Sequence, residues 1–436
     1  MYSDRIRLSS LQNKVMSAQE AASLIRDGMT VGMSGFTRAG EAKAVPLALI
    51  DRAKDEKLQI SLVTGASLGN DLDGKMASAG LLARRMPFQA DPVLRKAINA
   101  GEVMFIDQHL SHTVEQMRNH QIKRPDVTIV EALCITEQGH IVPTTSVGNS
   151  ANLAMFADQV IIELNLAHNL NLEGLHDIYF PGERPNRGPI PLTKVDDRLG
   201  SAAIPVDPAK IAAIVITNQP DSYSTVTPPD EETQAIANHL VEFFKSEVAA
   251  GRMAKNLGPM QVGIGNIANA VMCGLIDSPF DNLVMYSEVL QDCTFELIDA
   301  GKMNFASGCS ITLSERCNDR VFGNLEKYKD KLVLRPQEIS NHPELVRRLG
   351  IIGINTALEF DIYLIDEGMP ATTDVNFNRK AGSVLFDRLK TATVVVVSHQ
   401  PGTLEKFCRS AAVLRDGRLY MFETLDEAKQ YYDYSA

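Results

Sequence analysis

The sequence predicts an α/β fold made of two open sheets, each covered by helices on both faces. Short segments rich in Val and Ile alternate with helical segments along the first half of the chain. This alternation is typical of a parallel or mixed sheet. A strand that runs into a glycine turn occurs at Met29–Ser34 and again at Met260–Gly265. The repeat is weak as a signal, and it favours two halves of similar build.

The elements of the first half follow from caps and apolar runs. Residues 17–27 are expected to form a helix, because Ser17 can cap it and Glu20 completes a capping box. A strand over residues 29–33 and a helix from about Val45 enclose the next turn. Further apolar strands are expected at residues 60–64, 127–132, 159–164 and 212–216.

A boundary between the halves is expected at residues 218–232, where the chain is polar and rich in proline. A long helix is predicted from about residue 233 to residue 250, ahead of the second glycine turn. The second half is therefore expected to begin with the same order of elements as the first.

Composition narrows the class of protein. The 43 Lys and Arg residues against 54 Asp and Glu residues give a net charge of −11, which argues against nucleic acid or an anionic membrane as the general partner. No apolar run reaches the roughly 18 residues of a membrane span, and the N-terminus lacks a signal-peptide pattern. The six cysteines show neither C-x-x-C nor metal-ligand spacing. These features predict a cytoplasmic protein with free thiols, no metal and no membrane span.

Glu288 is the candidate catalytic residue. It lies in the segment 283–290, which is expected to be an apolar strand that runs into a helix capped by Ser287. Gly-rich turns are expected on both sides, at residues 262–266 and 305–310. A carboxylate near such turns is a candidate covalent nucleophile. The alternative is an acid stabilised by a helix dipole, and the residue types alone leave both readings open.

Several stretches of the chain carry a family resemblance. They are SGFT at 34–37, TGAS at 64–67, GIGNIAN at 263–269, MYSEVLQD at 285–292, GK at 301–302, FASGCS at 305–310 and LRPQEISN at 334–341. In this order, over about residues 18–363, the chain resembles the acetyl-CoA hydrolase/transferase family of class I CoA-transferases. Enzymes of the succinyl-CoA:acetate and propionyl-CoA:succinate type are the most similar.

The resemblance implies two α/β CoA-transferase domains with the active site between them, a homodimer, and an acyl-CoA and a small carboxylate as substrates. It gives Glu288 the role of a nucleophile that carries CoA as a glutamyl thioester, with acyl-CoA hydrolysis as a side activity. Coenzyme A would contact Gly263, Ile264, Gly265 and Asn266, and the small carboxylate would contact Ser34, Gly35, Phe36 and Thr37. Arg335 and Glu338 are expected to form a scaffolding pair. No step requires a metal.

The resemblance ends near Tyr363. Family members continue with a Gly-Ile-Gly-Gly-Ser-Gly-Asp loop, which this chain lacks. Residues 363–436 instead resemble the C-terminal piece of an ABC-transporter ATPase of the capsule polysaccharide export type. The matches are Asp366 and Glu367 to the Walker B acids, Asp374 to the D-loop, His399 to the switch histidine and Val413–Arg418 to the closing hairpin. The chain has no Walker A loop, so ATP hydrolysis by this chain alone is not expected.

Four segments are predicted from these boundaries. They are an N-terminal CoA-transferase domain at 1–217, a linker at 218–232, an incomplete C-terminal CoA-transferase domain at 233–362 and an ABC-ATPase-like fragment at 363–436. The apolar runs Val394–Val397 and Ala412–Leu414 are expected to pair with the edge of the second sheet. The fusion leaves two alternatives open, a hybrid without catalytic activity and an ATP-binding fragment of an ABC transporter.

Overall fold

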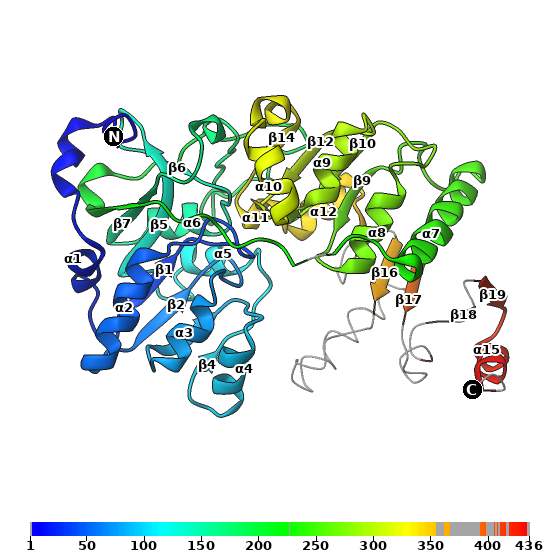
Figure 1. Ribbon diagram of the computed structural model, residues 1–436, viewed down its shortest axis with the longest axis horizontal. Helices are drawn as coiled ribbons and strands as arrows, with labels where there is room; N and C mark the ends of the chain where they lie inside the picture. The colour runs from blue at the N-terminus through cyan, green and yellow to red at the C-terminus, as the bar shows by residue number, and fades with distance from the viewer. Residues whose placement is uncertain are drawn as a thin grey trace. The chain divides into compact units, whose positions relative to one another are not determined.

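The computed structural model describes residues 2–225, 227–354, 362–366, 393–397, 405, 408, 410–415 and 418–433. Contacts between residues divide the chain into two compact units (Figure 1). Unit 1 comprises residues 1–225, 288–292 and 306–342, and unit 2 comprises residues 226–287, 293–305 and 343–436. The chain therefore leaves unit 1 and returns to it twice. The domain boundaries at residues 217, 232 and 362 stay predictions.

Unit 1 is built on an eight-stranded sheet, which confirms the mixed α/β fold expected from the Val- and Ile-rich segments. The strand order is β4-β3-β2-β1-β5-β7-β8, and β6 pairs antiparallel with β5 whereas the other pairs are parallel. The bounds are β1 Thr30–Met33, β2 Ile60–Val63, β3 Leu82–Met86, β4 Met104–Phe105, β5 Val127–Ile135, β6 Ile141–Pro143, β7 Gln159–Asn165 and β8 Ile211–Thr217. Every residue of β5 is buried, as expected for a central strand that is covered on both faces.

Helices of unit 1 connect these strands. They are α1 Ala18–Ser23, α2 Ala44–Asp55, α3 Leu72–Ser78, α4 Pro92–Asn99, α5 Thr113–Arg118 and α6 Ser150–Phe156. The predicted capping box of α1 is present, because Glu20 N–H donates to Ser17 Oγ and the Glu20 carboxylate accepts from Ser17 N–H. The helix ends at Ser23 rather than at residue 27. Its last turn tightens there, since Leu24 and Ile25 donate to carbonyls three residues earlier.

Apolar side chains between this sheet and helices α1–α4 form the main core of unit 1. Val31, Leu62 and Ile129 from the strands are almost completely buried with Leu49 and Leu94 from the helices. Burial of each such side chain stabilises the fold by about 1.5–3 kcal/mol relative to exposure. The turns that follow β1 and β2 are therefore attached to a rigid support.

Unit 2 begins with the long helix α7 Glu231–Ala249, close to the predicted range. Its parallel strands follow the order β10-β9-β15-β16-β17. The elements are β9 Pro259–Val262, α8 Asn266–Gly274, β10 Leu283–Tyr286, α9 Asp292–Asp299, α12 Pro343–Leu349, β15 Ile352–Ile354, β16 Ile362–Asp366 and β17 Thr393–Val397. The strand, glycine turn and helix seen at β1 and α2 thus recur at β9 and α8. No helix within the described residues is long and apolar enough to cross a membrane.

The two apolar runs near the C-terminus behave differently. Val394–Val397 lies in β17 and pairs in parallel with β16, as predicted for a sheet edge. Ala412–Leu414 does not join this sheet, because β18 Ala411–Arg415 pairs antiparallel with β19 Arg418–Phe422. The two strands satisfy each other's backbone groups, and helix α15 Leu425–Asp433 follows. The prediction that this run would extend the second sheet was wrong.

Candidate active site

Glu288 lies between two strands, not at a helix start. The segment around it forms β10 and then the two-residue strand β11 Val289–Leu290, which pairs in parallel with β13 Ser310–Ile311. Ser287 does not cap a helix, because its hydroxyl is bonded to the backbone of Val262 at 3.1–3.2 Å. Helix α9 begins only at Asp292. The helix-dipole reading of Glu288 therefore loses its structural basis.

The backbone around Glu288 is fixed by a glycine-containing segment. Its carbonyl oxygen accepts hydrogen bonds from the N–H groups of Cys309, at 2.6 Å, and Ser310, at 3.2 Å. These residues follow Gly308, where an added Cβ would lie 2.8 Å from Leu290 Cγ. The close approach of the two segments thus requires glycine at this position.

Among the residues that the structure describes, one donor contacts the Glu288 side chain. Asn341 Nδ2 donates to Glu288 Oε1. The residue is half-buried, and burial raises the pKa of its carboxyl group above the ordinary value, an effect that the Asn341 hydrogen bond partly opposes. A desolvated carboxylate with a single neutral donor is a stronger nucleophile than one that is fully hydrated or paired with a cation.

We expect covalent modification of Glu288 by acyl-CoA to become faster as the pH rises, with a midpoint above pH 4.5, the ordinary glutamate value. The carboxylate reacts and the carboxylic acid does not. The raised pKa also means that ionisation of Glu288 works against folding, so its contribution to stability is complete below pH 4.5 and is lost as the pH rises through the raised value. Rates of adduct formation across the acid range measure the midpoint. A midpoint at or below 4.5 contradicts this prediction.

Asn341 is held by the short helix that precedes it, α11 Gln337–Ser340. Gln337 Nε2 donates to the carbonyls of Gly65, at 3.1 Å, and Leu110, at 2.8 Å. Glu338 forms a buried bidentate ion pair with Arg118. The amide that faces Glu288 is therefore anchored to the turn after β2 and to the end of α5.

The expected Arg335–Glu338 pair does not form. Arg335 instead pairs with Asp177 and donates to Ser307 Oγ at 3.0 Å, and both charged groups are almost fully buried. Two separate buried ion pairs thus replace the single one that was predicted. Their partners, Asp177 and Arg118, lie more than 150 residues away in sequence, at separations of 158 and 220. Arg335 precedes α11 whereas Glu338 lies within it, and each side chain contacts a different, distant partner.

Glu338→Gln is expected to destabilise the protein by about 1.5–3 kcal/mol, the value of a hydrogen bond to a charged group. The change leaves the Arg118 guanidinium buried without a counter-charge. Because α11 carries Asn341, adduct formation at Glu288 should slow in the same variant. Urea unfolding and adduct kinetics measure the two effects, and Glu344→Gln, an exposed acid on the next helix, is the matched control. Equal stability of both variants would contradict the anchoring role.

The Ser34–Thr37 turn lies in the same unit as Glu288. Ser34 Oγ accepts from Glu131 N–H at 2.8 Å, and Thr312 Oγ1 donates to the Thr37 carbonyl at 2.8 Å. Gly35 has a φ of 129°, and a Cβ there would lie 2.8 Å from Glu41 Cβ, so the turn requires glycine. Phe36 packs with Ala66, Val289 and Cys309 in one apolar cluster. The structure thus places Phe36 in one cluster with Val289, the residue after Glu288, and with Cys309, whose N–H binds the Glu288 carbonyl.

Polar groups without partners accompany this turn. Among the described residues, the buried hydroxyl oxygens of Ser67, Ser146 and Ser310 have no hydrogen-bond partner. Ser67 accepts from Thr37 N–H through its carbonyl, and Ser146 forms an isolated bridge with Ser310. Such hydroxyls can donate to a carboxylate ligand.

The Gly263–Asn266 turn belongs to unit 2, between β9 and α8. Asn266 Oδ1 accepts from Thr227 N–H at 3.2 Å, whereas the Ile264 side chain is 53% exposed. An added Cβ on Gly265 would meet no atom within 4 Å. The exposed Ile264 side chain at this turn is accessible to a ligand. The assignment of coenzyme A to Gly263, Ile264, Gly265 and Asn266 stays a prediction.

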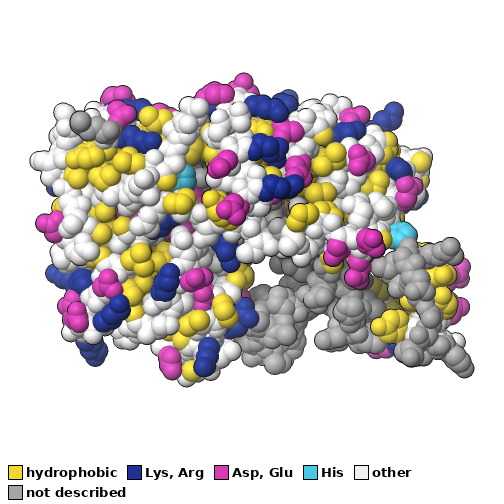
Figure 2. All heavy atoms as spheres, in the orientation of Figure 1, with side chains coloured by type: hydrophobic (Ala, Val, Ile, Leu, Met, Phe, Trp, Pro, Cys, Tyr) yellow, Lys and Arg dark blue, Asp and Glu magenta, His cyan; other side chains and the backbone are white. Residues whose placement is uncertain are grey.

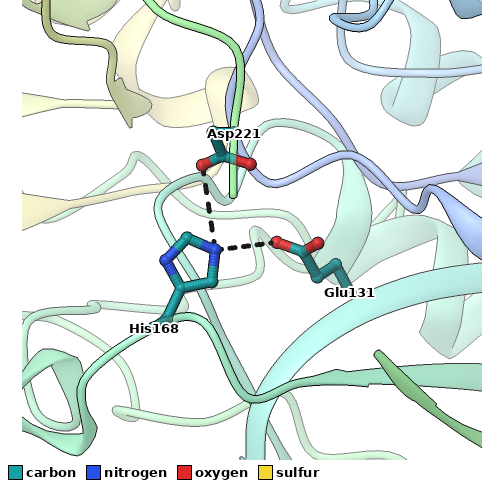
Figure 3. Close-up of side chains that lie close together, drawn as sticks. All are labelled: Glu131, His168 and Asp221. Atoms are coloured by element: carbon teal, nitrogen blue, oxygen red, sulfur yellow. Dashed lines mark ion pairs between the residues drawn. The ribbon is translucent and has the colours of Figure 1, made fainter. Parts of the chain in front are cut away.

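A buried charged cluster lies in unit 1 and was not foreseen from the sequence. The ligand atoms of Glu131, His168 and Asp221 all lie within 4.8 Å of one another, a spacing that suits a metal ion (Figure 3). Lys43 already supplies a cation, because its Nζ lies 2.6 Å from Glu131 Oε2 and 2.9 Å from Asp221 Oδ1. We therefore interpret the cluster as a structural ion-pair network. The signal for it was an acid, Glu131, within an apolar strand.

The space-filling view shows acidic and basic side chains interspersed over the visible face of unit 1 (Figure 2).

Asp366 ends β16, and Glu367, Asp374 and His399 lie outside the described residues. The ATPase roles expected for these four residues therefore stay predictions.

The mixed α/β fold with its parallel sheets is similar to that of solved structures. It is similar to RipA from Yersinia pestis, with a TM-score of 0.59 and 17% identity over 81% of this chain and 74% of RipA. It is also similar to a 4-hydroxybutyrate CoA-transferase from Porphyromonas gingivalis, with a TM-score of 0.54 and 16% identity over 89% of this chain and 81% of that protein.

Sequence comparison identifies the family. Residues 2–216 match the acetyl-CoA hydrolase/transferase N-terminal domain. The chain is 44% identical to the succinyl-CoA:acetate CoA-transferase of Clostridium kluyveri, over 82% of this chain and 67% of that enzyme. It is also 44% identical to the acetyl-CoA hydrolase of Saccharomyces cerevisiae, over 82% of this chain and 70% of that enzyme. The chain therefore belongs to the acetyl-CoA hydrolase/transferase family, and it is an enzyme of the CoA-transferase and acyl-CoA hydrolase type.

Proposed function

We propose that the chain is an acyl-CoA:carboxylate CoA-transferase that carries CoA on Glu288 as a glutamyl thioester. The observation that carries this proposal is the half-buried Glu288 carboxyl group, which has a raised pKa and, within the described part of the chain, the Asn341 amide as its one donor. Phe36 packs in one cluster with Val289 and Cys309, which lie next to Glu288 in the chain and in the paired strand region. This arrangement suits a nucleophile, because a purely structural acid at such a site would be paired with a cation or with several N–H groups.

CoA is transferred to Glu288 in two steps. The Glu288 carboxylate attacks the thioester carbonyl of an acyl-CoA and the C–S bond breaks. CoA leaves as a thiolate, and a mixed anhydride of Glu288 and the acyl group remains. The thiolate then attacks the glutamyl carbonyl, the acyl group leaves as a free carboxylate, and the enzyme keeps CoA as a thioester. An acceptor carboxylate reverses both steps. Each addition forms an oxyanion that needs N–H donors at about 2.7–3.1 Å.

Small carboxylates of the acetate, propionate and succinate class are the proposed acceptors. Two observations support this choice. Relatives carry the names succinyl-CoA:acetate CoA-transferase and acetyl-CoA hydrolase, and the hydroxyls of Ser67, Ser146 and Ser310 are available as donors. Ser34, Gly35, Phe36 and Thr37 would contact the acceptor, while Gly263, Ile264, Gly265 and Asn266 would contact the CoA arm. We further propose that the enzyme is a cytoplasmic homodimer of acetate or propionate metabolism and that it needs no metal.

A mass measurement tests the proposal. The protein is incubated with acetyl-CoA or succinyl-CoA without acceptor, digested at acid pH, and the peptide that contains Glu288 is analysed for a CoA thioester. A CoA adduct on Glu288 that disappears when acetate is added supports the transferase. CoA release without any adduct and without a dependence on acceptor supports a simple hydrolase, and an inert protein supports the inactive hybrid.

The region after residue 363 is proposed to derive from an ABC-transporter ATPase of the capsule polysaccharide export type. The parallel pair β16 and β17 and the antiparallel pair β18 and β19 are compatible with such a fragment. The lost glycine-rich loop of the family would shift activity toward hydrolysis, because removal of one oxyanion donor typically costs about 10²–10³ in rate. Comparison of CoA release with and without acceptor measures that shift.

A further inference from the structure

The side chain of Asn341 is shared between two partners in unit 1. Its Nδ2 donates to Glu288 Oε1, and its Oδ1 accepts from the thiol of Cys309, with an Sγ–Oδ1 distance of 3.7 Å. A primary amide has a donor end and an acceptor end, so these two contacts fix the same orientation of the Asn341 side chain. Cys309 is completely buried and cannot move away to water.

The backbone of Cys309 is fixed on both sides. Its N–H donates to the Glu288 carbonyl at 2.6 Å, and its own carbonyl accepts from Val147 N–H at 2.9 Å. Its side chain packs in the apolar cluster with Phe36 and Val289. One residue therefore contacts the main chain of the proposed nucleophile and the amide that faces the nucleophile's carboxyl group.

The thiol of Cys309 is a donor, not a nucleophile. Burial raises the pKa of this thiol far above its ordinary value, Ser340 opposes the shift, and the negative charge of Glu288 raises the pKa further. The sulfur therefore keeps its proton, which it can donate to Asn341 Oδ1. A thiolate at this position would repel that oxygen.

We propose that Cys309 is a positioning residue that holds the Asn341 amide toward Glu288 throughout the catalytic cycle. The proposal rests on the function proposed above for Glu288. The ionised carboxylate attracts Asn341 Nδ2 by itself, through a charge-assisted hydrogen bond. In the anhydride and the thioester, Glu288 carries no charge and attracts the amide less strongly. The thiol is then the contact that keeps the amide in place, so its effect should be largest in the half-reaction that consumes the thioester.

Cys309→Ala and Cys309→Ser test the proposal as a pair. Alanine removes the donor, whereas serine replaces S–H by O–H with little change of volume. We expect Cys309→Ala to slow the transfer of CoA from the Glu288 thioester to an acceptor by about two- to tenfold, the scale of one neutral hydrogen bond. The rate of thioester formation should change less, and Cys309→Ser should restore transfer.

The pH profile gives a second readout. The Asn341 hydrogen bond lowers the Glu288 pKa, and its loss removes that effect. The acid limb of the pH–rate profile should therefore move to higher pH in Cys309→Ala and not in Cys309→Ser. Glu288 and Cys309 are the titratable groups in this contact. The neighbouring His342 bonds Arg187 through its Nε2 at 3.0 Å. A change of packing alone would not shift the limb.

A third measurement does not depend on activity. Hydrogen exchange of the Asn341 side-chain amide, followed by NMR after selective labelling, should be faster in Cys309→Ala than in wild type and Cys309→Ser. Equal exchange and equal transfer in all three proteins would overturn the proposal, as would an equal loss in both variants. A wild-type protein that forms no Glu288 adduct would refute the proposed function, while the amide exchange would still decide whether Cys309 orients Asn341.

Discussion

Replacement of Glu288 by alanine is expected to abolish CoA transfer and the covalent adduct, a loss of about 10⁴-fold or more, as for other covalent nucleophiles. Alanine has no oxygen that can form the anhydride, and the neighbouring Cys309 and Asn341 cannot replace it. Cys309 is protonated and buried, and Asn341 is an amide. Stopped assays of CoA exchange between an acyl-CoA and an acceptor measure the effect.

Two further variants separate chemistry from folding. Glu288→Gln keeps the shape of the side chain and should be as inactive as alanine. Its stability to urea at neutral pH should be at least that of wild type, because the ionised carboxylate works against folding. Glu288→Asp retracts the carboxylate by one methylene, and a displacement of about 1 Å can reduce the rate by about 10². The exposed Glu102 provides the control, since Glu102→Ala should transfer CoA normally. Normal turnover by Glu288→Ala would exclude Glu288 as the nucleophile.

Periodicity and glycine turns predicted the five strands β1, β2, β5, β7 and β8 of unit 1, for a physical reason. Apolar residues such as Val31 and Ile129 fill these strands almost continuously, because both faces are covered. The strands β3, β4 and β6 were missed, since β3 contains Arg84 and Arg85 and the other two have only two or three residues. Ser17 and Glu20 likewise act through contacts three residues apart, which a sequence shows directly. Strand positions and helix caps of this kind can be predicted from the sequence alone.

Side-chain pairings over long separations could not be predicted in the same way. Asn341 meets Glu288 across 53 residues, and Lys43 meets Glu131 across 88 residues. Asn341 ends a stretch that carries the family resemblance, yet nothing in its sequence context shows which group its amide faces. The strand β11 was also unpredictable, because two residues pair with β13 only after the chain returns to unit 1.

Replacement of Lys43 by methionine is expected to destabilise the protein by about 3–5 kcal/mol, because it removes the ammonium group from a buried ion-pair network. Lys43 Nζ bonds Glu131, Asp221 and the Glu41 carbonyl, and the Lys43 and Glu131 side chains are only 2% and 0% exposed. Such a loss is a large fraction of the roughly 5–15 kcal/mol that stabilises a typical domain. The matched control is Lys43→Met combined with Glu131→Gln, which removes both charges and should lose less.

The pH dependence of this loss has a definite sign. Burial acts to raise the Glu131 pKa, and Lys43 with His168 holds that pKa at about 2. The pair therefore stabilises wild type above pH 4.5, and this contribution is lost as the pH falls toward 2. The difference in stability between wild type and Lys43→Met, measured by urea unfolding, should shrink on acidification. A difference that is constant or grows would contradict the ion-pair account.

Zinc distinguishes this network from a metal site. In wild type the ligand atoms of Glu131, Asp221 and His168 lie within 4.8 Å of one another, and Lys43→Ala would remove the ammonium group between the two acids. Zinc binds such ligands, and binding to the folded state alone stabilises it. Added Zn²⁺ should therefore raise the stability of Lys43→Ala, and a chelator should reverse the gain, while wild type should not respond. Equal stabilisation of wild type by Zn²⁺ would show that the cluster accepts a metal with Lys43 in place.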